Sequence, residues 1–240
     1  MEYGEFVDLK KLGAITSKGV AIYPWEGNAT PRVAETPSGM LNAIGLQNPG
    51  MEVFKNRDIP FMKKYDTVSI VNVVGKSAEE YIQAVEALSD TDVDMLEINI
   101  SCPNVKEGGI AFGTDKDVAA ALTKEIKAHA KQPVIMKLSP NVTSISEMAK
   151  AVEAAGADAL SLINTITGMK IDVERQSIFL ANKTGGLSGP AIRPVAVRMV
   201  YEVAHSVNIP IIGMGGITCA SDALEFILAG ATAVSVGTAN

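Results

Sequence analysis

Short apolar runs rich in β-branched residues alternate along the chain with stretches whose apolar residues recur at helical spacing. This alternation is typical of a parallel sheet built from βα units. The predicted strands cover residues 13–19, 68–75, 95–102, 134–139, 159–165, 210–216 and 233–239. The pattern therefore predicts an α/β fold with seven parallel strands.

Local signals mark where the intervening helices begin and end. They are the capping-box pairs Ser77/Glu80 and Ser144/Glu147 and the C-terminal glycines Gly156 and Gly230. The segments 154–160 and 228–234 resemble each other, which suggests that one βα unit is repeated around a ring. We predict a TIM (β/α)8 barrel that lacks the first strand and the last helix, with residues 1–240 as a single domain incomplete at both ends.

Two segments, 20–60 and 166–190, are too long to be simple connections. Both follow the carboxyl ends of predicted strands, where barrel enzymes place their active sites. We therefore expect these segments to carry functional residues.

Composition narrows the classes of function. The net charge of −6 comes without a cluster of Lys and Arg, which argues against nucleic acid binding. There is no apolar run of about 18 residues and no leader pattern, so we expect a cytoplasmic protein without a membrane span. The two cysteines and two histidines lack disulfide or metal-ligand spacing, so no metal is predicted. Cys219 is expected to be a buried small hydrophobe.

Every predicted strand ends in a polar residue or a glycine, and a purely structural barrel would not need such a ring. The residues at these ends are Lys18, Asn72, Asn99, Cys102, Lys137, Asn164, Thr165, Gly215, Gly216, Gly237 and Thr238. The glycines of the last two strands predict a phosphate site, with ordinary turn glycines as the alternative.

The other side chains suit a heteroaromatic ligand. Lys18 and Lys137 fit an anion, or a cofactor that becomes anionic on reduction, although each alone could be a surface lysine. Asn42, Asn99, Asn104 and Asn164 could match a pyrimidine-type edge or simply stabilise loops. Cys102 begins a glycine-rich loop and has no histidine nearby in sequence, which favours a general base over a nucleophile.

Across essentially its whole length the sequence resembles the class 1 dihydroorotate dehydrogenases. The resemblance is carried by residues 28–32, 42–50, 99–104, 136–141, 163–165, 185–190, 212–216 and 236–240. It implies an FMN-binding barrel in which Cys102 is the catalytic base for the oxidation of (S)-dihydroorotate to orotate in pyrimidine biosynthesis.

The resemblance also implies the binding residues. Those expected to contact FMN are Lys18, Gly19, Asn72, Asn99, Lys137, Ile163, Gly189, Gly215, Gly216, Gly237 and Thr238. Those expected to hold the substrate are Lys18, Asn42, Ala43, Ile44, Gly45, Leu46, Asn99, Asn104, Asn164 and Thr165.

The runs at 42–50 and 212–216 resemble the NAD-linked subclass, class 1B, more than the fumarate-linked one. This similarity implies a homodimer that forms a heterotetramer with an FAD and 2Fe-2S electron-transfer subunit. Three alternatives stay open: a fumarate-linked enzyme, a flavoenzyme of the dihydropyrimidine dehydrogenase type, and a non-catalytic fragment.

Overall fold

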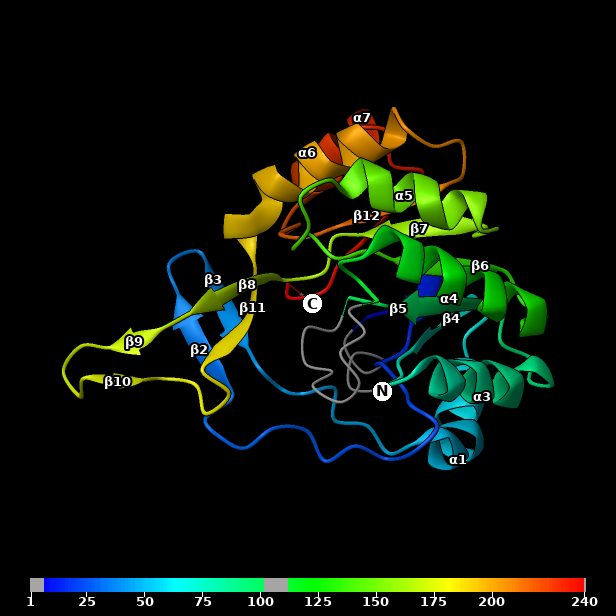
Figure 1. The fold of residues 1–240 in the computed structure, drawn as a ribbon, viewed down its shortest axis with the longest axis horizontal. Coiled ribbons are helices and arrows are strands. Elements are labelled where there is room, and N and C mark those ends of the chain that lie inside the picture. Colours follow the sequence, from blue (N-terminus) through cyan, green and yellow to red (C-terminus); the bar gives the residue numbers. More distant parts are fainter. Residues whose placement is uncertain (1–6, 102–111, 240) are drawn as a thin grey trace.

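The computed structural model describes residues 7–101 and 112–239 of the chain. Seven parallel strands form one curled sheet in the order β1-β4-β5-β6-β7-β12-β13 (Figure 1). Their bounds are β1 Ala14–Thr16, β4 Val68–Val73, β5 Met95–Asn99, β6 Val134–Lys137, β7 Ala159–Leu162, β12 Ile211–Met214 and β13 Ala233–Ser235. All seven predicted strands are present, and each ends two to four residues earlier than predicted. The sheet is that of a partial TIM barrel, and within the described residues β1 and β13 are its edges.

Helices follow the central strands and cover the outer side of the sheet (Figure 1). They are α3 Ala78–Ser89, α4 Lys116–His129, α5 Ile145–Ala154, α6 Arg193–Ala204 and α7 Ala220–Leu228. In α4 the buried residues recur at helical spacing, as Ala119, Leu122, Thr123 and Ile126 show, so one stripe packs on the sheet. No helix among the described residues is long and apolar enough to cross a membrane.

The two similar joints at the ends of α5 and α7 have the same geometry. Gly156 and Gly230 both adopt positive φ angles, of 101° and 108°. The N–H of Ala157 donates to Val152 at 3.1 Å, and the N–H of Ala231 donates to Phe226 at 2.9 Å. These bonds satisfy carbonyls that a helix end leaves without partners. The predicted glycine C-caps are confirmed.

The predicted capping residues also begin their helices, with one difference. The hydroxyls of Ser77 and Ser144 accept from the backbone N–H groups of Glu80 and Glu147, at 3.2 and 3.3 Å. The carboxylate of Glu80, however, accepts from the N–H of Lys76 at 2.8 Å. The return bond of the predicted capping box is therefore displaced by one residue.

The two long segments contain structure that the sequence did not predict. They supply a four-stranded antiparallel sheet in the order β2-β3-β11-β8, which stands beside the barrel in Figure 1. Its strands are β2 Val33–Thr36, β3 Gly39–Asn42, β8 Ile166–Met169 and β11 Thr184–Ser188. The hairpin of β9 (Ile171–Asp172) and β10 (Ser177–Ile178) projects from it as an arm.

The remaining elements are short. The first long segment ends in a continuous helical stretch formed by α1, a π-helical turn and α2. The bounds are α1 Met51–Val53, η3 Phe54–Asp58 and α2 Ile59–Met62, with 3-10 turns η2 at Leu9–Lys11 and η4 at Pro190–Ile192.

Cys219 corrects an expectation, because it is exposed and not buried. It is the N-cap residue of α7, one position before the helix begins. Its backbone N–H donates to Asp222 at 3.2 Å. At this position the backbone is used for capping, and the side chain lies outside the helical stripe that packs on the sheet.

Candidate active site

The carboxyl ends of β4, β5 and β6 bring polar side chains together on one face of the sheet. In the strand register Asn72 lies beside Glu97, and Asn99 lies beside Lys137. Because side chains two residues apart in a strand share a face, Glu97 and Asn99 point to the same side of β5. Three neighbouring strands thus place two asparagines, a lysine and a carboxylate next to one another.

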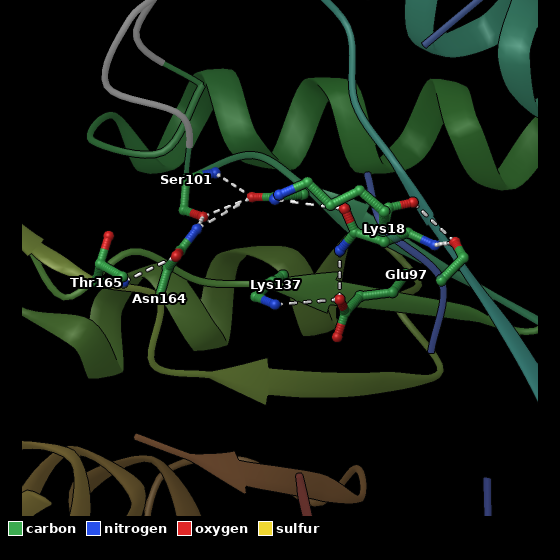
Figure 2. Close-up of polar contacts among 9 residues, drawn as sticks. Lys18, Glu97, Ser101, Lys137, Asn164 and Thr165 are labelled. Carbon is green, nitrogen blue, oxygen red and sulfur yellow. Dashed lines mark hydrogen bonds and ion pairs between the residues drawn. The ribbon is translucent and has the colours of Figure 1, made fainter. Parts of the chain in front are cut away.

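Asn99 is the centre of a hydrogen-bonded group that includes Ser101 and Asn164, both labelled in Figure 2. Its Nδ2 donates to Oδ1 of Asn72 at 3.4 Å. Its Oδ1 accepts from the hydroxyl of Ser101 at 2.6 Å and from Nδ2 of Asn164 at 3.3 Å. Asn164 also donates to the hydroxyl of Ser101 and accepts from the backbone N–H of Thr165 at 2.8 Å. The structure therefore joins three residues predicted for the substrate site, namely Asn99, Asn164 and Thr165.

Tyr81 supports Asn99 from the helix side. Its hydroxyl donates to the backbone carbonyl of Asn99 at 2.7 Å, and the side chain is buried. The Tyr81 ring meets the ring of Phe112 edge to face, with 5.8 Å between centroids. Helix α3 thereby fixes the end of β5.

Lys18 lies two residues beyond β1 and is fastened to the same group. The hydroxyl of Ser17 donates to the carbonyl of Lys18 at 2.9 Å and accepts from the N–H of Asn72 at 3.1 Å. Although part of the Lys18 side chain reaches solvent, burial of the ammonium lowers its pKa, and the positive charge of Lys137 lowers it further. Two like charges near each other favour an anionic ligand between them.

Glu97 is a site residue that the sequence analysis missed. Its side chain is 3% exposed, and its Oε1 accepts from the ammonium of Lys137 at 3.3 Å and from Nδ2 of Asn72. A buried carboxylate is costly unless charged or hydrogen-bonded partners compensate for the loss of water. The signal was available: Glu97 interrupts an apolar strand two residues before Asn99, which places both on one face.

The antiparallel sheet carries Asn42, which was predicted for the substrate site, and brings it to the side of Thr165. Asn42 is the register partner of Gly186, and its Nδ2 donates to the Gly186 carbonyl at 3.4 Å. A Cβ atom on Gly186 would lie 2.0 Å from the hydroxyl oxygen of Thr165. Glycine at 186 therefore lets Thr165 and the strand that carries Asn42 approach closely.

Asn141 also supports this side and was not predicted as a site residue. Its Nδ2 donates to the Thr165 carbonyl at 3.1 Å, and its Oδ1 accepts from Thr167 N–H at 2.9 Å. Its position in the run 136–141 was the only signal in the sequence.

The predicted run Ala43, Ile44, Gly45 and Leu46 forms a turn next to Gly19. A Cβ on Gly19 would lie 3.6 Å from Cδ2 of Leu46 and 3.0 Å from Oδ1 of Asn72. Gly45 and Leu46 both have positive φ angles, of 76° and 52°. Buried Asn48 holds the turn, because its Nδ2 donates to the Leu46 carbonyl at 2.9 Å. The structure thus places this run beside Lys18 and Gly19.

Glycines form a cradle near the ends of β7 and β12. Gly189, Gly215 and Gly216 have φ angles of 99°, 127° and 75°. A Cβ on Gly216 would lie 2.7 Å from the Gly189 carbonyl oxygen, and one on Gly215 would lie 3.4 Å from Ile163 Cγ1. The structure therefore brings Ile163, Gly189, Gly215 and Gly216 together as predicted.

Gly237 and Thr238 follow the neighbouring strand β13, which pairs with β12. Both residues are exposed, and a Cβ on Gly237 would have no heavy atom within 4 Å. They stand at the same edge of the sheet as Gly215 and Gly216, because the strands are parallel. The structure gives no direct contact between the two glycine pairs among the residues that it describes.

An ion pair fastens the loop that carries the cradle. Asp222 accepts from the N–H and hydroxyl of Thr218, at 2.9 and 2.7 Å, and pairs with Arg193 at the start of α6. The hydrogen bonds from Thr218 come first, followed by those from Cys219 and the charge of Arg193, in holding the pKa of the Asp222 carboxyl well below its usual range. The loop between β12 and α7 is thereby tied to α6.

Cys102 and Asn104 lie outside the described residues. In the sequence Cys102 follows Ser101 directly, and Ser101 is part of the Asn99 group. No group of three or more His, Cys, Asp or Glu side chains able to hold a metal ion occurs within residues 7–101 and 112–239.

The curled parallel sheet is that of an α/β-barrel enzyme, and the polar side chains and glycines gather at its carboxyl edge, where enzymes of this fold have their active sites. A family model described as "Dihydroorotate dehydrogenase" matches residues 1–240. The chain belongs to the dihydroorotate dehydrogenase family, and it is an oxidoreductase.

Curated relatives agree along the whole chain. It is 68% identical to a protein of Lachnoclostridium phytofermentans and 59% identical to one of Alkaliphilus metalliredigens. Both relatives are named "Dihydroorotate dehydrogenase B (NAD(+)), catalytic subunit", as is a Geobacillus protein at 58% identity. The matches cover 100% of this chain and 80%, 79% and 77% of the three relatives.

Proposed function

We propose that this chain is the catalytic subunit of an NAD-linked dihydroorotate dehydrogenase, which oxidises (S)-dihydroorotate to orotate in pyrimidine biosynthesis. The observation that carries the proposal is the Asn99 group, in which amides from β4, β5 and the end of β7 converge beside two lysines. Amides can match the alternating N–H and C=O edge of a dihydropyrimidine ring, and an ammonium can bind its carboxylate. The names of the relatives supply the subclass.

The proposed cofactor is FMN, bound by residues 1–240 as one domain. The glycine cradle fits a phosphate, because a Cβ on Gly216 would enter the space beside Gly189. The donor set fits a flavin, since Lys137 would place a positive charge where reduction adds a negative one. The FMN contacts proposed are Lys18, Gly19, Asn72, Asn99, Lys137, Ile163, Gly189, Gly215, Gly216, Gly237 and Thr238.

In this proposal FMN supplies the acceptor for the hydride that leaves C6 of the substrate. Cys102, as thiolate, takes the proton from C5, so that the product gains a C5=C6 double bond. An ordinary thiol titrates near about pH 8.5, so modest activation suffices for it to act as a base. The substrate contacts proposed are Lys18, Asn42, Ala43, Ile44, Gly45, Leu46, Asn99, Asn104, Asn164 and Thr165.

The residues of the chain also position the substrate before the reaction. Asn99 and Asn164 already hold each other and Ser101, so little side-chain freedom is lost when the ligand binds. Asn141 fixes the carbonyl of Thr165 in the same way. The relatives are named catalytic subunits, which supports a partner subunit. We propose a homodimer that associates with an FAD and 2Fe-2S subunit, through which electrons reach NAD.

The deciding experiment is anaerobic mixing of the FMN-loaded protein with dihydroorotate, followed by flavin absorbance. We expect rapid loss of the visible flavin band with dihydroorotate and none with dihydrouracil. Bleaching by dihydrouracil alone would favour the dihydropyrimidine dehydrogenase type. Reoxidation by fumarate, without the partner subunit, would favour the fumarate-linked class. A folded protein that takes up no flavin would support a non-catalytic fragment.

A further inference from the structure

The hydrogen bonds of the Asn99 group all run in one direction. The N–H of Thr165 donates to Oδ1 of Asn164, whose Nδ2 donates to Oδ1 of Asn99. Nδ2 of Asn99 donates to Oδ1 of Asn72, whose Nδ2 donates to Oε1 of Glu97. Three amides thus form a chain in which each one donates towards Glu97.

The two ends of the chain determine this direction. A carboxylate only accepts, and a backbone N–H only donates. With Glu97 ionised, Asn72 must turn its NH₂ group towards it, and its oxygen then faces Asn99. Asn99 must then donate to Asn72, and Asn164 must donate to Asn99. At the far end the oxygen of Asn164 accepts from the N–H of Thr165. Amide orientation, which is otherwise ambiguous, is therefore fixed by chemistry at both ends.

Glu97 has a second hydrogen-bond donor in addition to Asn72. The ammonium of Lys137 lies 3.3 Å from the same Oε1 atom, and only 17% of the Lys137 side chain is exposed. Both partners of this oxygen are donors, namely the ammonium of Lys137 and Nδ2 of Asn72. A carboxylate oxygen accepts from both, which fits the direction of the chain.

We propose that Glu97 is a positioning residue, which sets the direction of the amides of Asn72, Asn99 and Asn164 and holds the ammonium of Lys137. This inference rests on the proposed function, in which those amides and Lys137 contact the flavin and the substrate. With Glu97 in place, the oxygen of Asn99 accepts from Asn164 and Ser101. A reversed chain would put NH₂ groups where the amide oxygens of Asn72, Asn99 and Asn164 now lie.

Substitution Glu97→Gln tests the proposal, because glutamine has the same shape but can both donate and accept. If Glu97 only fills space, this variant keeps its affinity for orotate. If it sets direction, we expect the dissociation constant for orotate to rise by about 10-fold or more, the effect of about one misplaced hydrogen bond in a buried site. Affinity is measured by flavin difference spectra in FMN-saturated protein. The matched control is Glu202→Gln, an exposed carboxylate paired with Arg198, which should bind orotate normally.

A double variant moves the carboxylate from residue 97 to residue 72, its neighbour in the hydrogen-bonded chain. In Glu97→Gln with Asn72→Asp, residue 97 would donate to a carboxylate at position 72, which would again accept from Asn99. We expect this pair of changes to restore orotate affinity to within about 3-fold of the unmodified protein, since the directional restraint is renewed. Asn72→Asp alone would put two carboxylates face to face and should weaken binding. Failure of the double variant to recover any affinity would contradict the directional role.

The results separate this inference from the proposed function. If the unmodified protein binds no orotate, the proposed function fails. If it binds orotate and Glu97→Gln binds equally well, only the role of Glu97 is overturned. Should Glu97→Gln not fold, neutron diffraction of the unmodified protein reads the amide directions without any substitution. Nitrogen in place of oxygen on Asn99, facing Ser101, would overturn the proposal.

Discussion

The side-chain amide of Asn164 donates to Oδ1 of Asn99 at 3.3 Å, which joins the end of β7 to the end of β5 across the intervening strand β6. Both residues belong to the proposed substrate site. The contact exists in the protein alone, so the two amides are positioned by each other before any ligand binds. Substitutions that keep the shape of Asn164 but remove its donor therefore test the site directly.

We expect Asn164→Asp to weaken orotate binding by about 10- to 100-fold, because a carboxylate would face the oxygen of Asn99 and the donor of the Asn164 amide would be lost. Titration of the flavin spectrum with orotate measures the effect. Asn208→Asp makes the same change of charge at an exposed position before β12 and should bind orotate normally. If Asn164→Asp and Asn208→Asp bind orotate with equal affinity, Asn164 does not belong to the substrate site.

Cys102→Ala should abolish reduction of the flavin by dihydroorotate, while orotate binding stays within about 3-fold, because the base is lost and the binding groups remain. Cys102→Ser should keep slow activity that increases at higher pH, since a hydroxyl is a weaker acid than a thiol. Stopped-flow absorbance under anaerobic conditions gives the single-turnover rate. Near-normal reduction in the alanine variant would end the assignment of Cys102 as the base.

The sequence predicts the seven barrel strands because each is a short apolar run, and β4 to β7 are buried on both faces, which makes such runs easy to recognise. It does not predict the antiparallel sheet, whose strands are short and half-exposed and in part contain glycine, as Thr184–Ser188 shows. Their partners lie far away in the chain, so no local pattern marks them. The strand ends were predicted two to four residues too late, and the glycine C-caps at 156 and 230 were predicted correctly. Glu97 was missed because residues were judged by their position in the strand and not by the face to which they point.

We expect Gly216→Ala to weaken FMN binding by about 10-fold or more, because the added Cβ would lie 2.7 Å from the Gly189 carbonyl oxygen. Quenching of free FMN fluorescence by the apoprotein measures the affinity. Gly156→Ala is a matched control, since its φ is also positive but the nearest heavy atom, Lys127 Cγ, is 3.7 Å from the Cβ. The control should lose about 1 kcal/mol of stability and keep its FMN affinity.

Burial and the charge of Lys137 lower the pKa of Lys18, and burial is the larger cause. Lys137→Met should therefore raise the pKa of Lys18 without returning it to the usual value near about 10.4. NMR titration of the Lys18 side chain in FMN-free protein follows the change. Between the folded and unfolded pKa the unfolded chain binds more protons, so this residue makes stability increase with pH. If the pKa of Lys18 is the same in Lys137→Met as in the unmodified protein, the charge of Lys137 does not affect Lys18.

The depressed pKa of Asp222 makes its contribution to stability dependent on pH. Above about pH 3.9, the pKa of the carboxyl in the unfolded chain, the carboxylate stabilises the fold fully. This stabilisation is lost as the pH falls towards the lower pKa of the folded protein. Asp222→Asn should be less stable than the unmodified protein at pH 7, and the difference should shrink between about pH 5 and pH 2. Urea unfolding at several pH values measures it. Parallel curves for the two proteins would contradict this role of the ion pair with Arg193.

The antiparallel sheet has a consequence for the order of folding during synthesis. Asn42 binds the carbonyl of Gly186, and 144 positions separate the two residues. By the time β11 has been synthesised, five of the seven barrel strands have already been synthesised. The substrate side of the site is therefore completed late, and until then β3 is an unpaired edge that other chains can approach. A nascent chain that stalls before residue 184 would carry the amides of the barrel without the strand that encloses them.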